Sequence, residues 1–326
     1  MKDKLFYLIR LLSFNYFPFR FNKKSLLVLM FHQVNDKKTL FYPSMPVHAF
    51  KEMCQFVKKH YEVIHFSEIN EYYSKKVTKP AAIITFDDGN YDIVNNVFPI
   101  LKEMNLKFTI NIDTEILETS MSQDFVRVYD ILNSTKIDSF INRKFMNEPI
   151  RINKKNPIET EFIFTELLSN MSTQKRREFL IDMAIITKME DINFSKVVSF
   201  DDLKKLSESH LVEIGSHSHS HSILTKIPEE QLIIELKHSK EVLENLTGKN
   251  IDIIAYPNGI YNQSVQEIAK SVGYKYILKT NDKINVVNQQ FLNDKNFERV
   301  NQYHQTVESA LAHTFGIIKL IRKFSK

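Results

Sequence analysis

Short apolar runs, each ending at a polar or glycine-containing corner, recur along the chain and limit the folds open to it. They are Leu26–Phe31, Ala81–Phe86, Phe108–Ile112, Leu211–Ile214, Ile251–Tyr256 and Tyr274–Leu278. Continuous apolar runs are typical of strands that are buried on both faces of a parallel sheet. Helical patterns lie between them, and the clearest, Pro228–Leu246, opens with Pro-Glu-Glu and closes on Gly248. Alternating strands and helices predict an α/β layer or barrel fold.

One region is too long for this alternation. The stretch between Asp88 and His217 is several times as long as a βαβ unit, which takes roughly 30 residues. Residues 114–198 contain two helical patterns, Glu159–Leu168 and Thr173–Met189, together with a polar stretch. We interpret them as a mostly helical insertion. It is either a lid over one edge of a site or a stabilising appendage.

Composition indicates a globular protein. Hydrophobic residues make up 43% and charged residues 25% of the 326 positions, which are ordinary values for a folded domain. The single cysteine, Cys54, excludes an intramolecular disulfide and agrees with a reducing compartment. The apolar stretch Leu5–Leu12 is interrupted by Arg10 and is too short to cross a membrane, and no signal cleavage site follows it. We therefore expect a cytoplasmic protein.

The net charge of +5 is concentrated at the two ends. We predict a basic amphipathic N-terminal segment at residues 1–24 and a basic C-terminal helix at residues 303–326. Aromatic or aliphatic side chains mixed with Lys and Arg suit helices that lie on an anionic membrane surface, here the inner face. The alternative is two terminal helices that pack on the domain with solvated lysines. No basic patch is interleaved with aromatics elsewhere, so we expect no nucleic-acid partner.

Three of the six glycines fall in polar corners at strand ends. The corners are "TFDDGNYD" with Gly89, "EIGSHSHSH" with Gly215 and "AYPNGIYN" with Gly259. Functional sites of α/β sheets and barrels are built at the carboxyl ends of their strands. We therefore expect the three corners to converge in space.

The first two corners carry the chemistry. Asp87 and Asp88 are paired acids, which divide naturally into a metal ligand and a general base; a helix cap or Asx turn is the alternative. His217 and His221 stand four positions apart, as on one face of a helical turn, and could bind one metal while His219 points elsewhere. One carboxylate and two imidazoles leave positions open for water and substrate, as in a catalytic zinc site. The alternative is a solvated histidine-rich loop.

In this order the three corners resemble the first three motifs of the polysaccharide deacetylases, the NodB-homology domain of carbohydrate esterase family 4. The stretches "LLVLMFHQV" and "FVKKHYEVIHFSEI" also resemble members found in bacterial surface-polysaccharide and biofilm-polymer pathways. The resemblance covers roughly residues 25–115 and 198–302. It implies a distorted (β/α) barrel over residues 25–302, interrupted by the insertion, and metal-dependent removal of an acetyl group from a sugar.

The resemblance also implies roles for single residues. Asp88, His217 and His221 would bind a divalent metal, most simply Zn²⁺, and Asp87 would be the general base. A backbone N–H near Asn258 would help to hold the developing oxyanion.

Aromatic and polar residues near these positions complete the expected site. Tyr256 and Tyr261 either line a sugar subsite, with Asn258, or simply pack. We include Arg299, in "NFERVNQ", among the substrate-binding residues.

Two features depart from the family pattern. The arginine that commonly stands two residues before the proline of the third motif is replaced by Ala255, and we nominate Arg299 as the source of the missing guanidinium. The late Leu-x-His motif has no clear counterpart, since "YHQTVESALAH" offers His304 and His313 in a helical pattern. We prefer His32, at the end of the first strand, as the general acid. The alternative is a strand-end histidine satisfied by backbone.

The sequence thus predicts a metal-dependent hydrolase. It would remove an acetyl group, most simply N-acetyl, from an amino sugar of a bacterial surface polysaccharide, an oligosaccharide or a lipid-linked precursor. Two alternatives stay open: a deacylase or deformylase of a nucleotide- or lipid-linked sugar, and a catalytically inactive sugar-binding barrel.

Overall fold

The computed structural model describes residues 23–188 and 193–316. The predicted N-terminal segment therefore lies outside the described residues except for Lys23 and Lys24, and so do the last ten residues of the predicted C-terminal helix. Among the helices that are described, none is long and apolar enough to cross a membrane.

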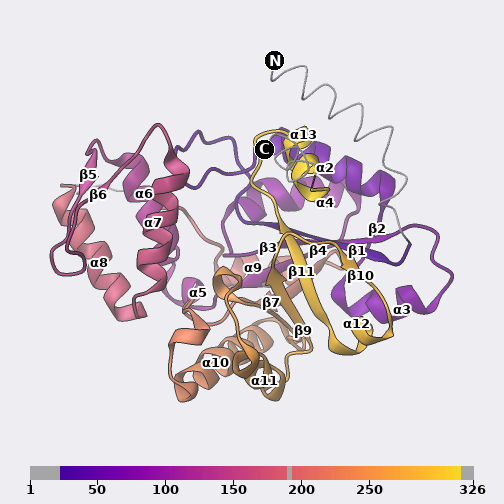
Figure 1. The fold of residues 1–326 in the computed structure, drawn as a ribbon. Helices are drawn as coiled ribbons and strands as arrows, with labels where there is room; N and C mark the ends of the chain where they lie inside the picture. Colours follow the sequence, from indigo (N-terminus) through magenta and orange to yellow (C-terminus); the bar gives the residue numbers. More distant parts are fainter. Residues whose placement is uncertain (1–22, 189–192, 317–326) are drawn as a thin grey trace, which may run out of the picture.

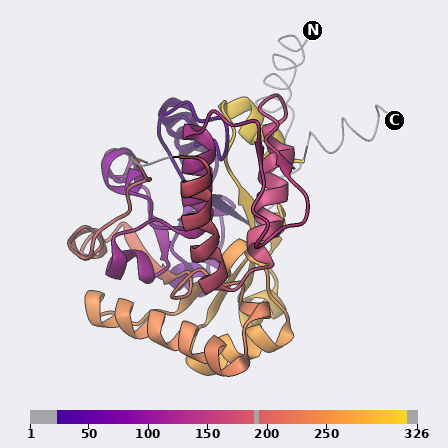
Figure 2. The same ribbon diagram turned by 90° about the vertical axis from the view of Figure 1, so that its left-hand side faces the viewer.

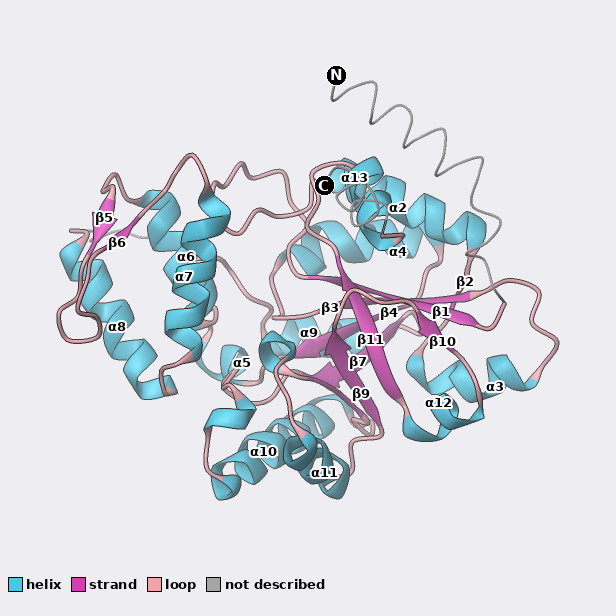
Figure 3. Ribbon diagram, viewed as in Figure 1, coloured by secondary structure: helices cyan, strands magenta, loops and turns pink. Residues whose placement is uncertain are grey.

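A closed barrel of parallel strands forms the centre of the molecule (Figure 3). Around the ring its strands are β1 (Ser25–Phe31), β3 (Ala81–Phe86), β4 (Phe108–Ile112), β7 (Val212–Ser216), β8 (Ile253–Ala255), β9 (Tyr276–Thr280) and β11 (Asn296–Asn301). The ring closes because β1 pairs with both β3 and β11, with Leu26 opposite Ala81 and Leu29 opposite Val300. The short strands β2 (Glu62–Val63) and β10 (Asn285–Val286) extend it at β3 and β1. The barrel predicted from the resemblance is confirmed.

Helices surround the barrel, and capping residues mark the ends of two of them. They are α2 (Val47–His60), α3 (Ile69–Ser74), α4 (Phe98–Met104), α9 (Phe200–Ser207), α10 (Glu229–Thr247), α11 (Gln263–Val272), α12 (Gln289–Asp294) and α13 (Val307–Thr314). Helix α9 opens with a capping box, in which Ser199 and Asp202 exchange hydrogen bonds. Helix α10 ends at Gly248, whose φ of 67° is a left-handed conformation that glycine adopts without strain.

The strands are buried on both faces, as their continuous apolar runs predict. Along β1, Leu27 and Leu29 belong to the large core shared with the surrounding helices, whereas Leu26 and Val28 belong to a second cluster. This alternation places the second cluster inside the barrel. The interior is therefore largely a packed apolar core, although Thr109 and Glu213 bring polar groups into it near the amino ends of β4 and β7.

The insertion forms a helical lobe beside the barrel (Figures 1 and 2). The lobe consists of α5 (Glu115–Thr119), α6 (Asp124–Ser134), the hairpin β5 (Ser139–Phe140) and β6 (Ile150–Arg151), α7 (Pro157–Ser169) and α8 (Thr173–Ile186). It has its own apolar core, in which the rings of Phe140, Phe164 and Phe179 pack together. Helices α7 and α8 lie at the two helical patterns of the sequence, whereas α5, α6 and the hairpin were not predicted.

Candidate active site

The three glycine-containing corners meet at one cavity of about 430 Å³ at the carboxyl ends of the strands. From the barrel, its lining includes His32, Asp87, Asp88, His217, His221, Tyr256, Asn258 and Arg299. From the lobe, α6 contributes Phe125 and Tyr129, and α7 contributes Glu161 and Thr165. The lobe therefore forms one wall of the cavity.

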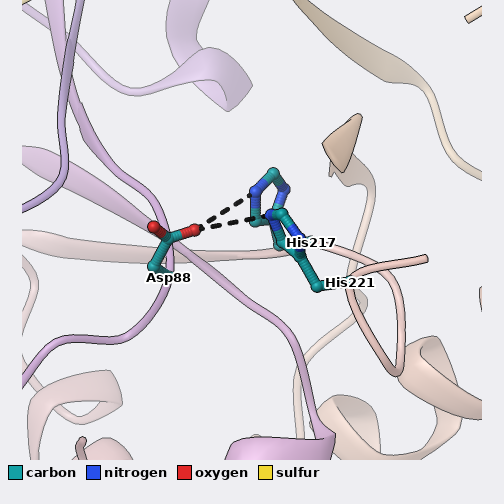
Figure 4. Close-up of side chains that lie close together, drawn as sticks. All are labelled: Asp88, His217 and His221. Carbon is teal, nitrogen blue, oxygen red and sulfur yellow. Dashed lines mark ion pairs between the residues drawn. The ribbon is translucent and has the colours of Figure 1, made fainter. Parts of the chain in front are cut away.

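Asp88, His217 and His221 lie together in this cavity (Figure 4). Oδ1 of Asp88 is 3.4 Å from Nε2 of His217 and 3.8 Å from Nε2 of His221, and all three side chains are buried. The three ligand atoms lie within 4.8 Å of one another. Metal–ligand bonds of about 2.0–2.2 Å in a tetrahedral site place neighbouring ligand atoms about 3.4 Å apart, so the spacing fits a zinc-sized cation.

The backbone that carries the two histidines is a loop, so the predicted helical turn is wrong. The chain leaves β7 at Ser216 and adopts left-handed conformations at Ser218 (φ 66°) and His221 (φ 50°). The Glu235 carboxylate accepts the backbone N–H groups of His219 and Ser220, at 3.1 and 2.9 Å, in place of helical carbonyls. The loop reverses and still turns both imidazoles toward Asp88.

Asp88 is also held by unusual backbone geometry. Its φ is 73°, and that of the following Gly89 is 60°. At this positive φ a side chain is strained, and a Cβ atom at Gly89 would also press on the end of the Ile116 side chain, so the corner favours glycine. The tight turn aims the Asp88 carboxylate at the histidines.

The hydrogen bond of His217 suits metal binding. Its Nδ1 is 2.7 Å from the carbonyl oxygen of Ala255. Donation from Nδ1–H to that carbonyl turns Nε2 toward Asp88, where a bound cation would replace the Nε2 proton, and proteins orient metal-bound histidines in this way. His221 has a buried Nδ1 without a partner among the described residues.

Buried charges in the cavity shift the pKa values of its groups. Burial lowers the pKa of His217, but the carboxylates of Asp87 and Asp88 outweigh burial and raise that pKa to about 9. Burial and the neighbouring His217 lower the pKa of His221 to about 3. Burial raises the pKa of Asp88, yet the hydrogen bond to His217 and nearby histidines hold it well below its usual range. The cavity thus holds two ionised carboxylates, those of Asp87 and Asp88, and these need positive charge beside them.

Two hydrogen-bond donors hold the carboxylate of Asp87 in place. Its Oδ1 accepts hydrogen bonds from Nη1 of Arg299 at 2.8 Å and from Nδ2 of Asn111 at 2.7 Å. Burial raises the pKa of Asp87, but the Arg299 guanidinium outweighs burial and lowers it to about 2. Asp87 is therefore an ionised carboxylate at neutral pH. Arg299 reaches it from β11 and supplies a guanidinium, which Ala255 cannot provide.

The alternative acids are separated in space. His32 follows β1 and lines the cavity with the two aspartates. His304 and His313 do not line it; their rings lie 4.8 Å apart, and His313 contacts Asp282 at 3.2 Å. The geometry favours His32 as the histidine near the reacting groups.

The two predicted sugar-contacting tyrosines have different positions. Tyr256 lines the cavity, and its hydroxyl is buried without a partner in the described part of the chain. Tyr261 stacks against Tyr256 at 5.5 Å, beneath the Lys279 ammonium, and is not part of the lining. Asn258 is exposed at the rim with a φ of 54°, and its amide donates to Oγ of Ser169 in the lobe at 3.2 Å.

Sequence reasoning missed several polar residues that contact the aspartates. The hydroxyl of Tyr42 donates to Oδ2 of Asp88 at 3.3 Å, and its ring stacks on Tyr129 of the lobe at 5.3 Å. Gln123 donates to Asp88 at 3.0 Å and to Asp113 at 2.9 Å. Only Asn111 gave a signal, because an amide inside the apolar run "FTINI" needs a buried partner.

Comparison with known proteins defines the class. The sequence profile described as polysaccharide deacetylase matches residues 74–277. The chain belongs to this family and is a carbohydrate deacetylase, hence a hydrolase. Deacetylases of this family act on polysaccharides and generally use a divalent metal, and the cluster around Asp88 is a ligand set of that kind. No match was found among the curated proteins.

Solved structures share the fold at low sequence identity. The Streptococcus pyogenes deacetylase PplD in complex with acetate has a TM-score of 0.59 and 17% identity, with 90% of this chain and 99% of that one covered. IcaB from Ammonifex degensii has a TM-score of 0.57 and 14% identity, with coverage of 89% and 97%. A de-N-acetylase from Aggregatibacter actinomycetemcomitans has a TM-score of 0.53 and 17% identity, with coverage of 85% and 94%. At these identities the likeness supports the fold alone.

Proposed function

We propose that the protein is a Zn²⁺-dependent deacetylase that removes an N-acetyl group from an amino sugar of a bacterial surface polysaccharide or its precursor. One observation carries the proposal: the buried group Asp88, His217 and His221 lies in the same cavity as the ionised carboxylate of Asp87. We choose N-acetyl as the group removed by analogy with the de-N-acetylase that shares this fold.

Asp88 and the Nε2 atoms of His217 and His221 would hold the metal. A divalent cation bound there supplies Lewis-acid chemistry for hydrolysis. Tyr42 and Gln123 would help to position this ligand, because each donates a hydrogen bond to the Asp88 carboxylate and restricts its rotation.

Asp87 would act as general base. It accepts a proton from the water that attacks the acetyl carbonyl, and its own C–O group is fixed because Arg299 and Asn111 both bond Oδ1. Ionisation at neutral pH is required for this role, and the guanidinium ensures it. The backbone N–H at Asn258, on the cavity rim, is assigned to the developing oxyanion.

His32 would act as general acid and donate a proton to the leaving amine. It lines the same cavity, whereas the two other histidines considered do not. The tyrosine face of the cavity and the lobe wall would bind the sugar: Tyr256 offers a hydroxyl that has no partner among the described residues, and Tyr129 offers an aromatic surface. Tyr261 would act indirectly, by supporting the ring of Tyr256.

The proposed location of the protein in the cell rests on the basic residues at the two ends of the chain. A cytoplasmic enzyme whose basic ends contact the inner membrane face would meet lipid-linked sugars. Flotation with anionic vesicles, comparing the full chain with one lacking residues 1–22 and 317–326, tests this; equal flotation of both contradicts a role of these ends.

The function is tested by measuring acetate release from N-acetylated oligosaccharides, O-acetylated sugars and lipid-linked amino sugars. Protein that has been stripped of metal with a chelator should be inactive, and it should regain activity when Zn²⁺ is added. Acetate release that persists after complete metal removal would contradict metal dependence. Turnover confined to O-acetyl substrates would contradict the N-acetyl assignment.

A further inference from the structure

A second group of metal-ligating side chains lies outside the cavity, where the lobe meets the barrel. Glu118 of α5, His219 of the loop after β7 and His238 of α10 bring three ligand atoms within 4.8 Å of one another. Nε2 of His238 is 3.1 Å from Oε1 of Glu118, and the rings of His219 and His238 are 4.5 Å apart at 83°. His238 and Glu118 are 44% and 39% exposed, so a cation can reach them from solvent.

His219 is held in place before any ligand arrives. Its Nδ1 is 2.9 Å from Oγ1 of the buried Thr114, and its backbone N–H donates to Glu235 at 3.1 Å. With Nδ1–H as donor, the lone pair of Nε2 is free for a metal. His217 has the corresponding arrangement, in which a backbone carbonyl takes the place of the threonine hydroxyl. Second contacts of this kind orient metal-binding histidines.

We propose that Glu118, His219 and His238 form a second metal site that binds a borderline divalent transition cation such as Zn²⁺. Two imidazoles and one carboxylate suit Zn²⁺, whereas Mg²⁺ and Ca²⁺ prefer sites made of oxygen atoms. An exposed Glu–His pair alone is an ordinary surface contact. The third ligand, His219, is fixed by two hydrogen bonds and turns the pair into a site with an open position for water.

Occupation of this site would join three parts of the molecule. Helix α5 is the first helix of the lobe, α10 packs on the barrel, and His219 stands between the two active-site histidines in sequence. The cation would therefore fasten the lobe to the barrel and restrain the loop that presents His217 and His221. The proposal stands independently of the proposed function, because neither Glu118 nor His238 lines the cavity.

Metal stoichiometry of the full-length protein tests the proposal. The protein is stripped with a chelator and dialysed against buffered Zn²⁺ at neutral pH, and bound zinc is measured by mass spectrometry. We expect two Zn²⁺ per chain in the wild type, and one in His238→Ala and in Glu118→Gln. The exposed His210, which belongs to neither cluster, provides the matched control, and His210→Ala should bind two.

A second readout locates the effect. Zn²⁺ should slow amide hydrogen exchange in residues 115–119 and 229–247 of the wild type, and this slowing should be lost in His238→Ala. Equal zinc content in His238→Ala and the wild type would overturn the proposal, and so would an equal loss in His210→Ala. His217→Ala separates the two sites: it should lose the active-site zinc and retain the one that His238→Ala removes.

Discussion

Replacement of Arg299 by methionine tests the arrangement around Asp87 most directly. Arg299 is 1% exposed, and its Nη1 bonds Oδ1 of Asp87, which is also 1% exposed. Methionine fills much of the same volume without a charge, so Arg299→Met leaves a buried carboxylate with Asn111 as its remaining side-chain donor. The change removes the charge beside Asp87 together with the hydrogen bond from the guanidinium to the carbonyl of Lys279.

The expected magnitude follows from the burial of the pair. The pKa of Asp87, about 2 against 3.8 for a free aspartate, corresponds to roughly 2 kcal/mol of stabilisation of the charged form. Removal of one partner of a buried ion pair costs about 3–5 kcal/mol, because the other charge is left uncompensated. Asp87 can escape part of this cost by taking up a proton, so we expect a loss of about 3 kcal/mol at neutral pH. Such a loss is a large part of a typical stability of about 5–15 kcal/mol.

The sign of the pH dependence follows from the lowered pKa of Asp87. Stabilisation by the pair is present above about pH 4 and is lost as the pH falls toward 2. Without the guanidinium the pKa of Asp87 rises, so the proposed base is protonated over a wider pH range. The acidic limb of kcat/KM should therefore move to higher pH in Arg299→Met.

Urea unfolding followed by circular dichroism measures the stability, and acetate release between pH 4 and 9 measures the profile. Arg299→Lys retains the charge and should keep most of the stability. The double variant Asp87→Asn/Arg299→Met removes both charges and should be more stable than Arg299→Met alone. If Arg299→Met unfolds at the wild-type urea concentration and keeps the wild-type acidic limb, the guanidinium does not set the charge state of Asp87.

Further substitutions separate the roles within the cavity. His217→Ala should lose the active-site metal while Asp87→Asn keeps it and falls at least about 100-fold in rate; equal metal content in His217→Ala would refute the ligand assignment. His32→Ala should lower kcat by about 100-fold or more, whereas His304→Ala should change it little, and the reverse result would transfer the acid role. Tyr42→Phe removes one hydrogen bond to the carboxylate ligand and should weaken zinc binding by about tenfold in a competition titration with a chelator; unchanged affinity would show that this hydroxyl does not position the ligand.

Much of the barrel could be predicted from the sequence because its strands are buried on both faces. The runs Ala81–Phe86 and Phe108–Ile112 coincide with β3 and β4, since each is bounded by residues that cannot continue a buried strand. The meeting of the three glycine-containing corners follows from parallel strand order, in which all carboxyl ends point the same way. This regularity placed Asp87, Asp88 and His217 together.

The remaining parts depend on tertiary contacts that leave no local pattern. The spacing of His217 and His221 suits a helix, but the Glu235 carboxylate from α10 captures the loop N–H groups and holds a different backbone. Tyr42 lies in an irregular loop and Gln123 next to an unpredicted helix, so neither has a periodic context. Gln123 reaches Asp88 because the lobe folds against the barrel, whereas Tyr42 reaches it from the loop after β1.

The surroundings of Asp87 are complete only when the barrel has closed. Strand β11, which completes the ring by pairing with β1, is the last of the described strands to be synthesised, and it carries Arg299 to an Asp87 that lies 212 positions earlier. A nascent chain that stops short of residue 296 lacks both the closing strand and the guanidinium. Contacts of such long sequence separation form slowly, because a large loop must close first. Asp87, the proposed general base, thus acquires its counter-charge only when the strand that seals the barrel is in place.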